Sequence, residues 1–251
     1  MNAKSSTPVL LPRRGLLGLA AAGLAVGVPA LAGCAAGPQA QRPRVGTSPP
    51  PSSMAAASPA TLGPPDEALA QLFAGNARFA EGRALAPHRD LARLAEVAPK
   101  QTPFAAFLGC ADSRVPVEIV FDQGFGDIFV TRIAGNVADP TVIGSLEFGT
   151  LVLGAKVLFV LGHTSCGAVS ATAKGDAVPG QISTLYQHIR PAVKTSGGDV
   201  GRAIVANVRN QMEILAEASP AIVQLIREDK VIVAGGVYDL SSGRVTPVKA
   251  G

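Results

Sequence analysis

The sequence predicts an α/β fold in which a central, mostly parallel β-sheet is flanked by helices. Four short runs of continuous apolar residues indicate strands buried on both faces, as the strands of parallel sheets are. Stretches with helical periodicity separate most of these runs, which is the alternation typical of α/β domains. The composition, 47% hydrophobic and 16% charged over 251 residues, is sufficient for one domain with a buried core.

The N-terminal segment has the pattern of an export signal. Arg13 and Arg14 directly precede an apolar run of Ala, Leu, Gly and Val, which is the order found in signal peptides. The paired arginines resemble the twin-arginine signal. Residues 31–34, Leu-Ala-Gly-Cys, resemble a bacterial lipobox in which Cys34 becomes the lipidated first residue. Ordinary cleavage without lipid attachment is the alternative.

These patterns divide the chain into three parts. We expect a signal peptide at residues 1–33, a flexible tether rich in Pro, Ala and Ser at 34–65, and a catalytic domain at 66–251. The signal carries three of the four net positive charges, so the remainder is nearly neutral and nucleic acid is not an expected partner. The expected location is extracytoplasmic, periplasmic or at the cell surface, with a membrane contact only through the lipid.

The elements of the domain follow from apolar periodicity. Asp66 is expected to cap a first helix with an apolar stripe at Leu69, Leu72, Phe73 and Phe79. The predicted strands are Phe104–Leu108, Ile128–Val130, Val157–Leu161 and Val231–Ala234. The predicted helices are Thr141–Leu153, Ala168–Lys174, Ile182–Val193, Ile204–Ala216 and Ala221–Arg227.

Two short segments carry residues that bind metals, and each follows a predicted strand. Cys110 and Asp112 come after the first strand, and His163 and Cys166 come after the third. Ligands of parallel sheets gather beyond the carboxyl ends of the strands. If these two strand ends are neighbours, the four side chains converge, and two thiolates with one imidazole suit Zn²⁺ better than harder cations.

Two simpler interpretations compete with the metal site. An exported protein favours disulfides, and with Cys34 assigned to the lipobox, Cys110 and Cys166 remain as a possible pair. That pairing does not explain the neighbouring acid, Arg and His, so we favour metal. Similarly, Asp112 and Arg114 would form an ordinary surface ion pair, worth about 0–1 kcal/mol, if they lay away from the ligands.

The two segments together resemble the signature pair of the β-class carbonic anhydrases. They read Cys-Ala-Asp-Ser-Arg at 110–114 and Gly-His-Thr-Ser-Cys-Gly at 162–167. The resemblance covers roughly residues 68–248, with further similar segments at 72–79, 132–136, 145–148 and 236–239. It implies a β-carbonic-anhydrase-like fold, one zinc ion per chain, a homodimer or larger homo-oligomer, and reversible hydration of CO₂ to bicarbonate and a proton by zinc-bound hydroxide.

The resemblance also assigns roles to the reactive residues. It implies that Cys110, His163 and Cys166 are permanent zinc ligands, and that the fourth position holds either water or Asp112. In the active state of the family Asp112 pairs with Arg114 instead, which frees the metal for water. This agrees with the open position that a catalytic zinc keeps. Asp112 and Arg114 are therefore the expected catalytic pair.

A substrate pocket follows from the same resemblance. Its expected members are the Gln101 amide, the Gly167 backbone amide, and Phe129 and Phe148 as an apolar wall for CO₂. Some members of the family carry Tyr at the position of Phe148, and many have Asn in place of Ile133. The chain has no Trp, which the bicarbonate-inhibited members use. His88 and His188 receive no role.

Other functions remain open at this level. Hydrolysis of CS₂ or COS uses the same kind of zinc site, so only substrate access would distinguish it. A zinc-holding bicarbonate sensor without turnover is a second alternative, although the presence of both Asp112 and Arg114 argues against it. A disulfide-linked surface binding protein is the third, and metal analysis would separate it from the enzymes.

Overall fold

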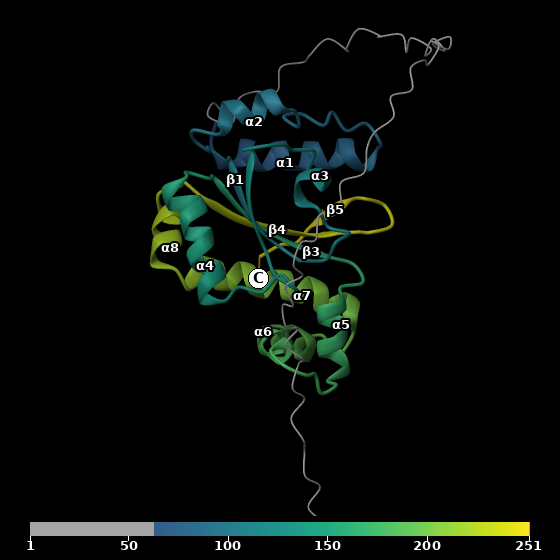
Figure 1. Ribbon diagram of the computed structural model, residues 1–251. Helices are drawn as coiled ribbons and strands as arrows, with labels where there is room; N and C mark the ends of the chain where they lie inside the picture. The colour runs from purple at the N-terminus through teal and green to yellow at the C-terminus, as the bar shows by residue number, and fades with distance from the viewer. Residues whose placement is uncertain (1–62, 251) are drawn as a thin grey trace, which may run out of the picture. The chain divides into compact units, whose positions relative to one another are not determined.

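The computed structural model describes residues 63–250 (Figure 1). The predicted signal peptide, the lipobox with Cys34 and most of the tether lie outside the described residues. The first helix, α1, spans Pro65–Ala80. The predicted cap is wrong, because Asp66 lies within the first turn and the cap position is Pro64, whose ring offers no hydrogen bond to the helix. Asp66 and Glu67 instead place negative charge at the positive end of the helix dipole.

The described residues form a five-stranded sheet, and the predicted α/β class is confirmed. The strands are β1 Ala105–Gly109, β2 Ile128–Arg132, β3 Val157–His163, β4 Ile232–Tyr238 and β5 Val245–Pro247. Their order is β2-β1-β3-β4-β5, with the first four strands parallel and β5 antiparallel at one edge. The chain passes from β1 to β2 on one side and returns to β3 on the other, so the crevice at the carboxyl ends of β1 and β3 is a switch point where ligands bind.

Three strands run past their predicted ends into a glycine, and β1 ends on the first of these glycines, Gly109. β3 continues through Gly162 to His163, and β4 continues through Gly235 and Gly236. A Cβ at Gly162 would lie 2.5 Å from a methyl of Val208. At Gly162 and Gly235, α7 packs too close to the sheet for a side chain, whereas a Cβ at Gly236 would lie 2.6 Å from a methyl of Val245 on β5. An apolar pattern places the end of a strand at a glycine, because the sequence does not show which distant elements pack against that position.

Helices fill the connections between the strands. The longer ones are α4 Pro140–Glu147, α5 Gly167–Lys174, α6 Ile182–Thr195, α7 Val200–Glu217 and α8 Pro220–Arg227, and the short ones are α2 Leu91–Val97 and α3 Val117–Val120. The helix predicted from Thr141 changes at Phe148 into a π-helical turn, η2 Phe148–Val152. The short α2, α3 and β5 were not predicted, because each has too few residues to show a periodicity.

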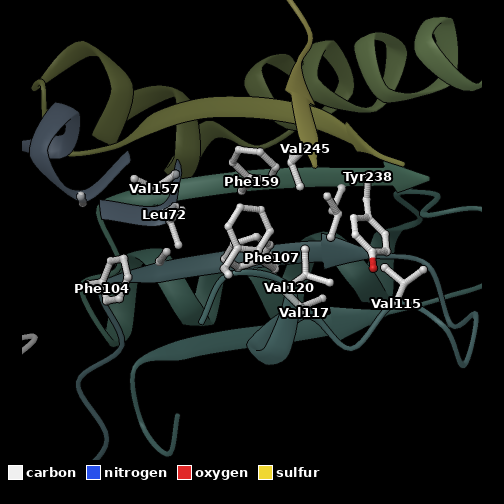
Figure 2. Packing of buried hydrophobic residues seen from close by; sticks show 14 residues of the cluster. Leu72, Phe104, Phe107, Val115, Val117, Val120, Val157, Phe159, Tyr238 and Val245 are labelled. Carbon is white, nitrogen blue, oxygen red and sulfur yellow. The ribbon is translucent and has the colours of Figure 1, made fainter. Parts of the chain in front are cut away.

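The sheet separates two apolar layers. On one face α1 and α3 cover Phe107 and Phe159, whose ring centroids lie 5.3 Å apart, and Figure 2 shows these rings in the middle of the cluster. On the other face α4, α7 and α8 cover Leu108 and Val160. Figure 1 shows the same layers, with α1 and α2 on one side of the strands and α4, α7 and α8 on the other. Burial of both faces explains the continuous apolar runs in the sequence.

One buried polar side chain connects α1 to the rest of this layer. Asn76, 4% exposed, donates hydrogen bonds to the carbonyls of Val120 (3.0 Å) and Gly243 (2.9 Å). Its side-chain oxygen accepts from the backbone N–H of Val245, at 2.8 Å. The amide therefore satisfies three backbone groups from α3, the β4–β5 turn and β5, which have no water to pair with.

Replacement of Asn76 by Ala should lower the free energy of unfolding by at least about 2 kcal/mol, because each buried backbone group left unpaired costs about 1–3 kcal/mol. Urea unfolding followed by circular dichroism measures the loss. Ser183→Ala, at an exposed position of α6, serves as the control and should change stability by less than about 0.5 kcal/mol. Equal stability of the two variants would contradict the structural role of Asn76.

Candidate metal centre

The metal centre forms where β1 and β3 end side by side. Cys110 follows the last residue of β1, His163 is the last residue of β3, and Cys166 directly precedes α5. The candidate ligand atoms of these three buried residues all lie within 4.8 Å of one another. Both cysteines are free thiols, which is incompatible with the disulfide interpretation.

His163 presents one nitrogen to this cluster. Its Nδ1 lies 2.9 Å from the carbonyl oxygen of Thr164, so Nδ1–H donates there and Nε2 keeps its lone pair. Nε2 is buried and has no hydrogen-bond partner among residues 63–250. Thr164 is itself held, because its backbone N–H donates to the carbonyl of Tyr238 and its hydroxyl accepts from the N–H of Leu240. A fixed, unpartnered imidazole nitrogen beside two thiols fits a zinc ion.

The two thiols shift each other's pKa in opposite directions in the absence of a metal. The neighbouring Cys166 thiol lowers the pKa of Cys110 to about 4, with His163 and the backbone amide of Gly135 acting in the same direction against the effect of burial. The Cys110 thiolate in turn raises the pKa of Cys166. We conclude that the metal-free pair holds one thiolate. Burial lowers the pKa of His163, but the interaction with Cys110 outweighs it and the net pKa is raised.

Asp112 rests on Arg114 rather than among the ligands. The guanidinium donates from Nε to Oδ1 at 2.9 Å and from a terminal nitrogen to Oδ2 at 2.8 Å. This bidentate pair holds the pKa of Asp112 well below its usual range, so the carboxylate stays ionised at neutral pH. Oδ2 also lies 3.8 Å from Nε2 of His163. The pair therefore faces the ligand cluster and is not an isolated surface contact.

The remaining predicted residues lie in two places. Gly167 begins α5 beside Cys166, with its backbone exposed near the cluster. Gln101 precedes β1 and lies near the amino end of this strand, whereas Cys110 follows its carboxyl end. Phe129 and Phe148 contact each other with ring centroids 6.3 Å apart. Phe129 pairs with Ala106 of β1, and Phe148 begins η2, so both lie away from the carboxyl ends of the strands, where the cluster is. A single chain thus brings only Gly167 to the centre.

The structure adds residues to which the sequence assigned no role. Arg132 at the end of β2 donates to the carbonyls of Cys110 (2.8 Å) and Asp112 (2.5 Å), which fixes the first ligand segment. Asn207 and Gln211 of α7 are 1% and 0% exposed and bind the loop after β2. The available signal was two amides four residues apart on a predicted helix, and nothing in the sequence shows which way they face.

The comparisons with known proteins agree with this geometry. The family model described as carbonic anhydrase matches residues 105–245, which include strands β1 to β4 and the whole metal centre. The chain belongs to the carbonic anhydrase family, in its β class. The carbonic anhydrase of Mycolicibacterium smegmatis is 38% identical over 68% of this chain and 87% of its own length. Carbonic anhydrase 2 of Mycobacterium tuberculosis is 38% identical over 72% and 91%.

Solved structures support the same class. The β-carbonic anhydrase CafA of Aspergillus fumigatus is 27% identical over 63% of this chain and 81% of its own, with a TM-score of 0.59. The Coccomyxa enzyme, solved with acetazolamide, is 27% identical over 72% and 86%, with a TM-score of 0.57. This carbonic anhydrase is accordingly a zinc-dependent enzyme that interconverts CO₂ and bicarbonate, and its buried Cys-His-Cys cluster is suited to hold the metal.

Cys166→Ser should abolish stoichiometric zinc binding in this carbonic anhydrase, because a hydroxyl does not ionise to replace the thiolate ligand. Part of the stability should be lost with the metal, since its binding energy contributes to folding. Elemental analysis of the purified chain, expected at about one zinc per native chain, measures this. Cys34→Ser is the matched control, because it removes a thiol outside the domain and should keep the zinc. Full zinc content in Cys166→Ser would overturn the ligand assignment.

Proposed function

We propose that this carbonic anhydrase hydrates CO₂ reversibly at a zinc ion held by Cys110, His163 and Cys166, with the Asp112–Arg114 pair acting on the attacking oxygen. The observation that carries the proposal is the position of the Asp112 carboxylate. It is ionised, held at two points by Arg114, and 3.8 Å from the unpartnered Nε2 of His163. An acceptor of fixed direction therefore lies beside the position where the three ligand atoms meet.

The chemistry divides between the metal and the chain. Zinc, when bound, lowers the pKa of a water molecule from about 15.7 towards about 7 and so supplies a nucleophile near neutral pH. Two thiolate ligands donate charge and work against this, so the chain has to assist. Asp112 Oδ2 accepts a hydrogen bond from the attacking oxygen and turns its free lone pair towards CO₂. Arg114 keeps that carboxylate charged and fixed, and the Gly167 amide at the start of α5 donates to an oxygen of bicarbonate.

The alternatives have less support. The named relatives are carbonic anhydrases, which favours CO₂ over CS₂ or COS as the substrate. A bicarbonate sensor without turnover would have no use for the bidentate Asp112–Arg114 pair beside the metal cluster, because binding bicarbonate needs donors rather than a fixed carboxylate. We therefore retain hydration of CO₂ as the function.

A second copy of the chain would complete the substrate pocket. Gln101, Phe129 and Phe148 lie away from the cluster of their own chain, so they can serve a metal centre only in another one. β2 is an edge strand of the described sheet, and Phe148 contacts its Phe129. Phe148, Leu151 and Val152, all in η2, are 46%, 56% and 63% exposed. An open edge with neighbouring apolar side chains favours pairing with a second copy. We infer a homodimer or larger homo-oligomer.

Sedimentation of the purified enzyme should accordingly give at least a dimer at the concentrations used for activity assays. Leu151→Lys places a charge in the exposed apolar group and should shift the population towards the monomer, with activity falling in parallel because the pocket loses its second chain. Ile182→Lys, at another exposed apolar position on α6, should change neither. A fully active monomer would contradict the shared pocket.

Export and anchoring remain proposals from the sequence. We propose that Arg13 and Arg14 direct transport of the folded, zinc-loaded enzyme, and that lipid on Cys34 holds it to the membrane through the tether. A mature bacterial lipoprotein carries the two or more acyl chains that stable anchoring needs. Among residues 63–250, no helix is long and apolar enough to cross a bilayer. In this proposal the lipid is the anchor, and the location is periplasmic or at the cell surface.

Asp112→Asn should retain zinc and lower the rate of CO₂ hydration by about 10²–10⁴-fold, because the neutral amide cannot orient the attacking oxygen as the carboxylate does. Stopped-flow hydration and zinc content measured on the same sample give both quantities. Asp176→Asn, at an exposed loop position, is the matched control and should keep the native rate. Unchanged turnover in Asp112→Asn would reduce the pair to a structural contact.

Cell fractionation tests export and anchoring. Cys34→Ala should release soluble, active enzyme outside the cytoplasm, because the lipid is the only anchor proposed. Arg13→Lys with Arg14→Lys should retain folded, zinc-loaded enzyme in the cytoplasm, since the twin-arginine route requires the arginines. If the native chain fractionates as soluble protein and Cys34→Ala changes nothing, the lipid anchor is wrong while the enzyme assignment stands.

A further inference from the structure

One loop outside the two ligand segments touches a ligand atom. The backbone N–H of Gly135, in the loop between β2 and α4, donates a hydrogen bond to Sγ of Cys110 at 3.3 Å. Gly135 has φ +78°, and a Cβ there would lie 2.7 Å from Cδ1 of Ile189 on α6. Both the backbone conformation and the space require glycine at this position. Glycine has no side chain to restrict its backbone, so the direction of the Gly135 N–H depends on the contacts that hold the loop.

Two buried amides of α7 hold it. Asn207 Nδ2 donates to the carbonyl oxygen of Gly135 at 2.9 Å, and Asn207 Oδ1 accepts from Gln211 Nε2 at 3.3 Å. Gln211 Oε1 in turn accepts from the backbone N–H of Ala138 at 2.7 Å. The two side chains form a continuous hydrogen-bonded bridge across the loop, from Gly135 to Ala138. Both are essentially unexposed, so water does not compete for these groups.

Close packing of α7 on the sheet gives the bridge its reach. Val208, the neighbour of Asn207, lies where side chains at Gly162 and Gly235 would be, since a Cβ at these positions would come within 2.5 and 2.8 Å of its methyl groups. Gly162 directly precedes the ligand His163. The same contact that brings α7 against β3 and β4 therefore brings Asn207 to the loop that binds Cys110.

We propose that Asn207 and Gln211 are positioning residues of the zinc centre, acting through the Gly135 amide on the Cys110 sulfur. The inference rests on the proposed assignment of Cys110 as a ligand. An N–H donor to a metal-binding thiolate withdraws charge from the sulfur and fixes its direction, and loss of such outer contacts costs about 10- to 100-fold in metal affinity or activity. Without the bridge, the carbonyl of Gly135 loses its buried donor, and the peptide is no longer held in the direction that places the N–H on Sγ.

A purely structural role makes a different prediction. Asn76 is a second buried Asn that satisfies backbone groups, but it lies on α1, across the sheet from α7. Asn76→Ala therefore matches Asn207→Ala in residue type and burial and removes more backbone hydrogen bonds, three against one, without a connection to Cys110. If Asn207 only stabilises the fold, the two variants should treat the metal alike.

The experiment compares native full chain, Asn207→Ala, Gln211→Met and Asn76→Ala, each loaded with zinc. The rate of zinc transfer to a chromogenic chelator is measured in native buffer, and the sulfur-to-metal charge-transfer bands are recorded after Co²⁺ substitution. We expect release about 10- to 100-fold faster in Asn207→Ala, a smaller increase in Gln211→Met, and shifted cobalt bands in both. Asn76→Ala should release zinc at the native rate with native bands, although it is less stable.

Each outcome either supports or contradicts the positioning role. If Asn207→Ala releases zinc like Asn76→Ala and keeps the native cobalt bands, the positioning role is wrong even though the ligand assignment stands. If Asn207→Ala does not fold, Gln211→Met carries the same comparison, because it breaks the bridge at its second residue while keeping the length of the side chain. Failure of the ligand assignment itself is recognised separately, by zinc retained in Cys166→Ser.

Discussion

Parallel pairing of β1 with β3 is the constraint on which the metal centre depends. In this register Gly109 lies opposite Leu161, so the two strands reach the same edge of the sheet together. β1 ends there and Cys110 follows, whereas β3 continues two residues further to His163. Because the strands are buried on both faces, a shift by one residue would exchange the side chains that pack in the two apolar layers and disrupt both. The hydrophobic core therefore fixes the spacing of the ligands.

Charge at the centre is balanced by groups from several elements. Two thiols and an imidazole are buried together, and without a metal they relieve their repulsion by sharing protons, as the lowered pKa of Cys110 and the raised pKa of Cys166 show. A divalent cation held by Cys110, His163 and Cys166 would compensate the thiolate charge and satisfy Nε2 of His163, which has no other partner in the described chain. The Asp112 carboxylate stays outside this set because Arg114 offers it two charge-assisted hydrogen bonds.

Glycines connect the packing of the core to the site. Gly162 and Gly235 admit α7 against the sheet, and Gly135 admits α6 against the loop beside Cys110. The approach of α7 also brings Asn207 Nδ2 to 2.9 Å from the carbonyl oxygen of Gly135. The side-chain amides of α7 are therefore buried in the core, and a hydrogen bond to Gly135 connects them to the metal centre.

The sequence by itself determined the α/β class, the strand cores and the two ligand segments, because apolar runs and the spacing of Cys and His are local patterns. It misplaced the cap of α1 and ended three strands before a glycine that belongs to the strand, since capping geometry and the approach of distant elements are not local. Only the tertiary structure decided that the ligand segments meet, that Asp112 pairs with Arg114, and that Gln101 lies at the opposite end of β1 from the metal centre. These depend on strand order and on side-chain direction, which arise when segments remote in sequence pack against one another.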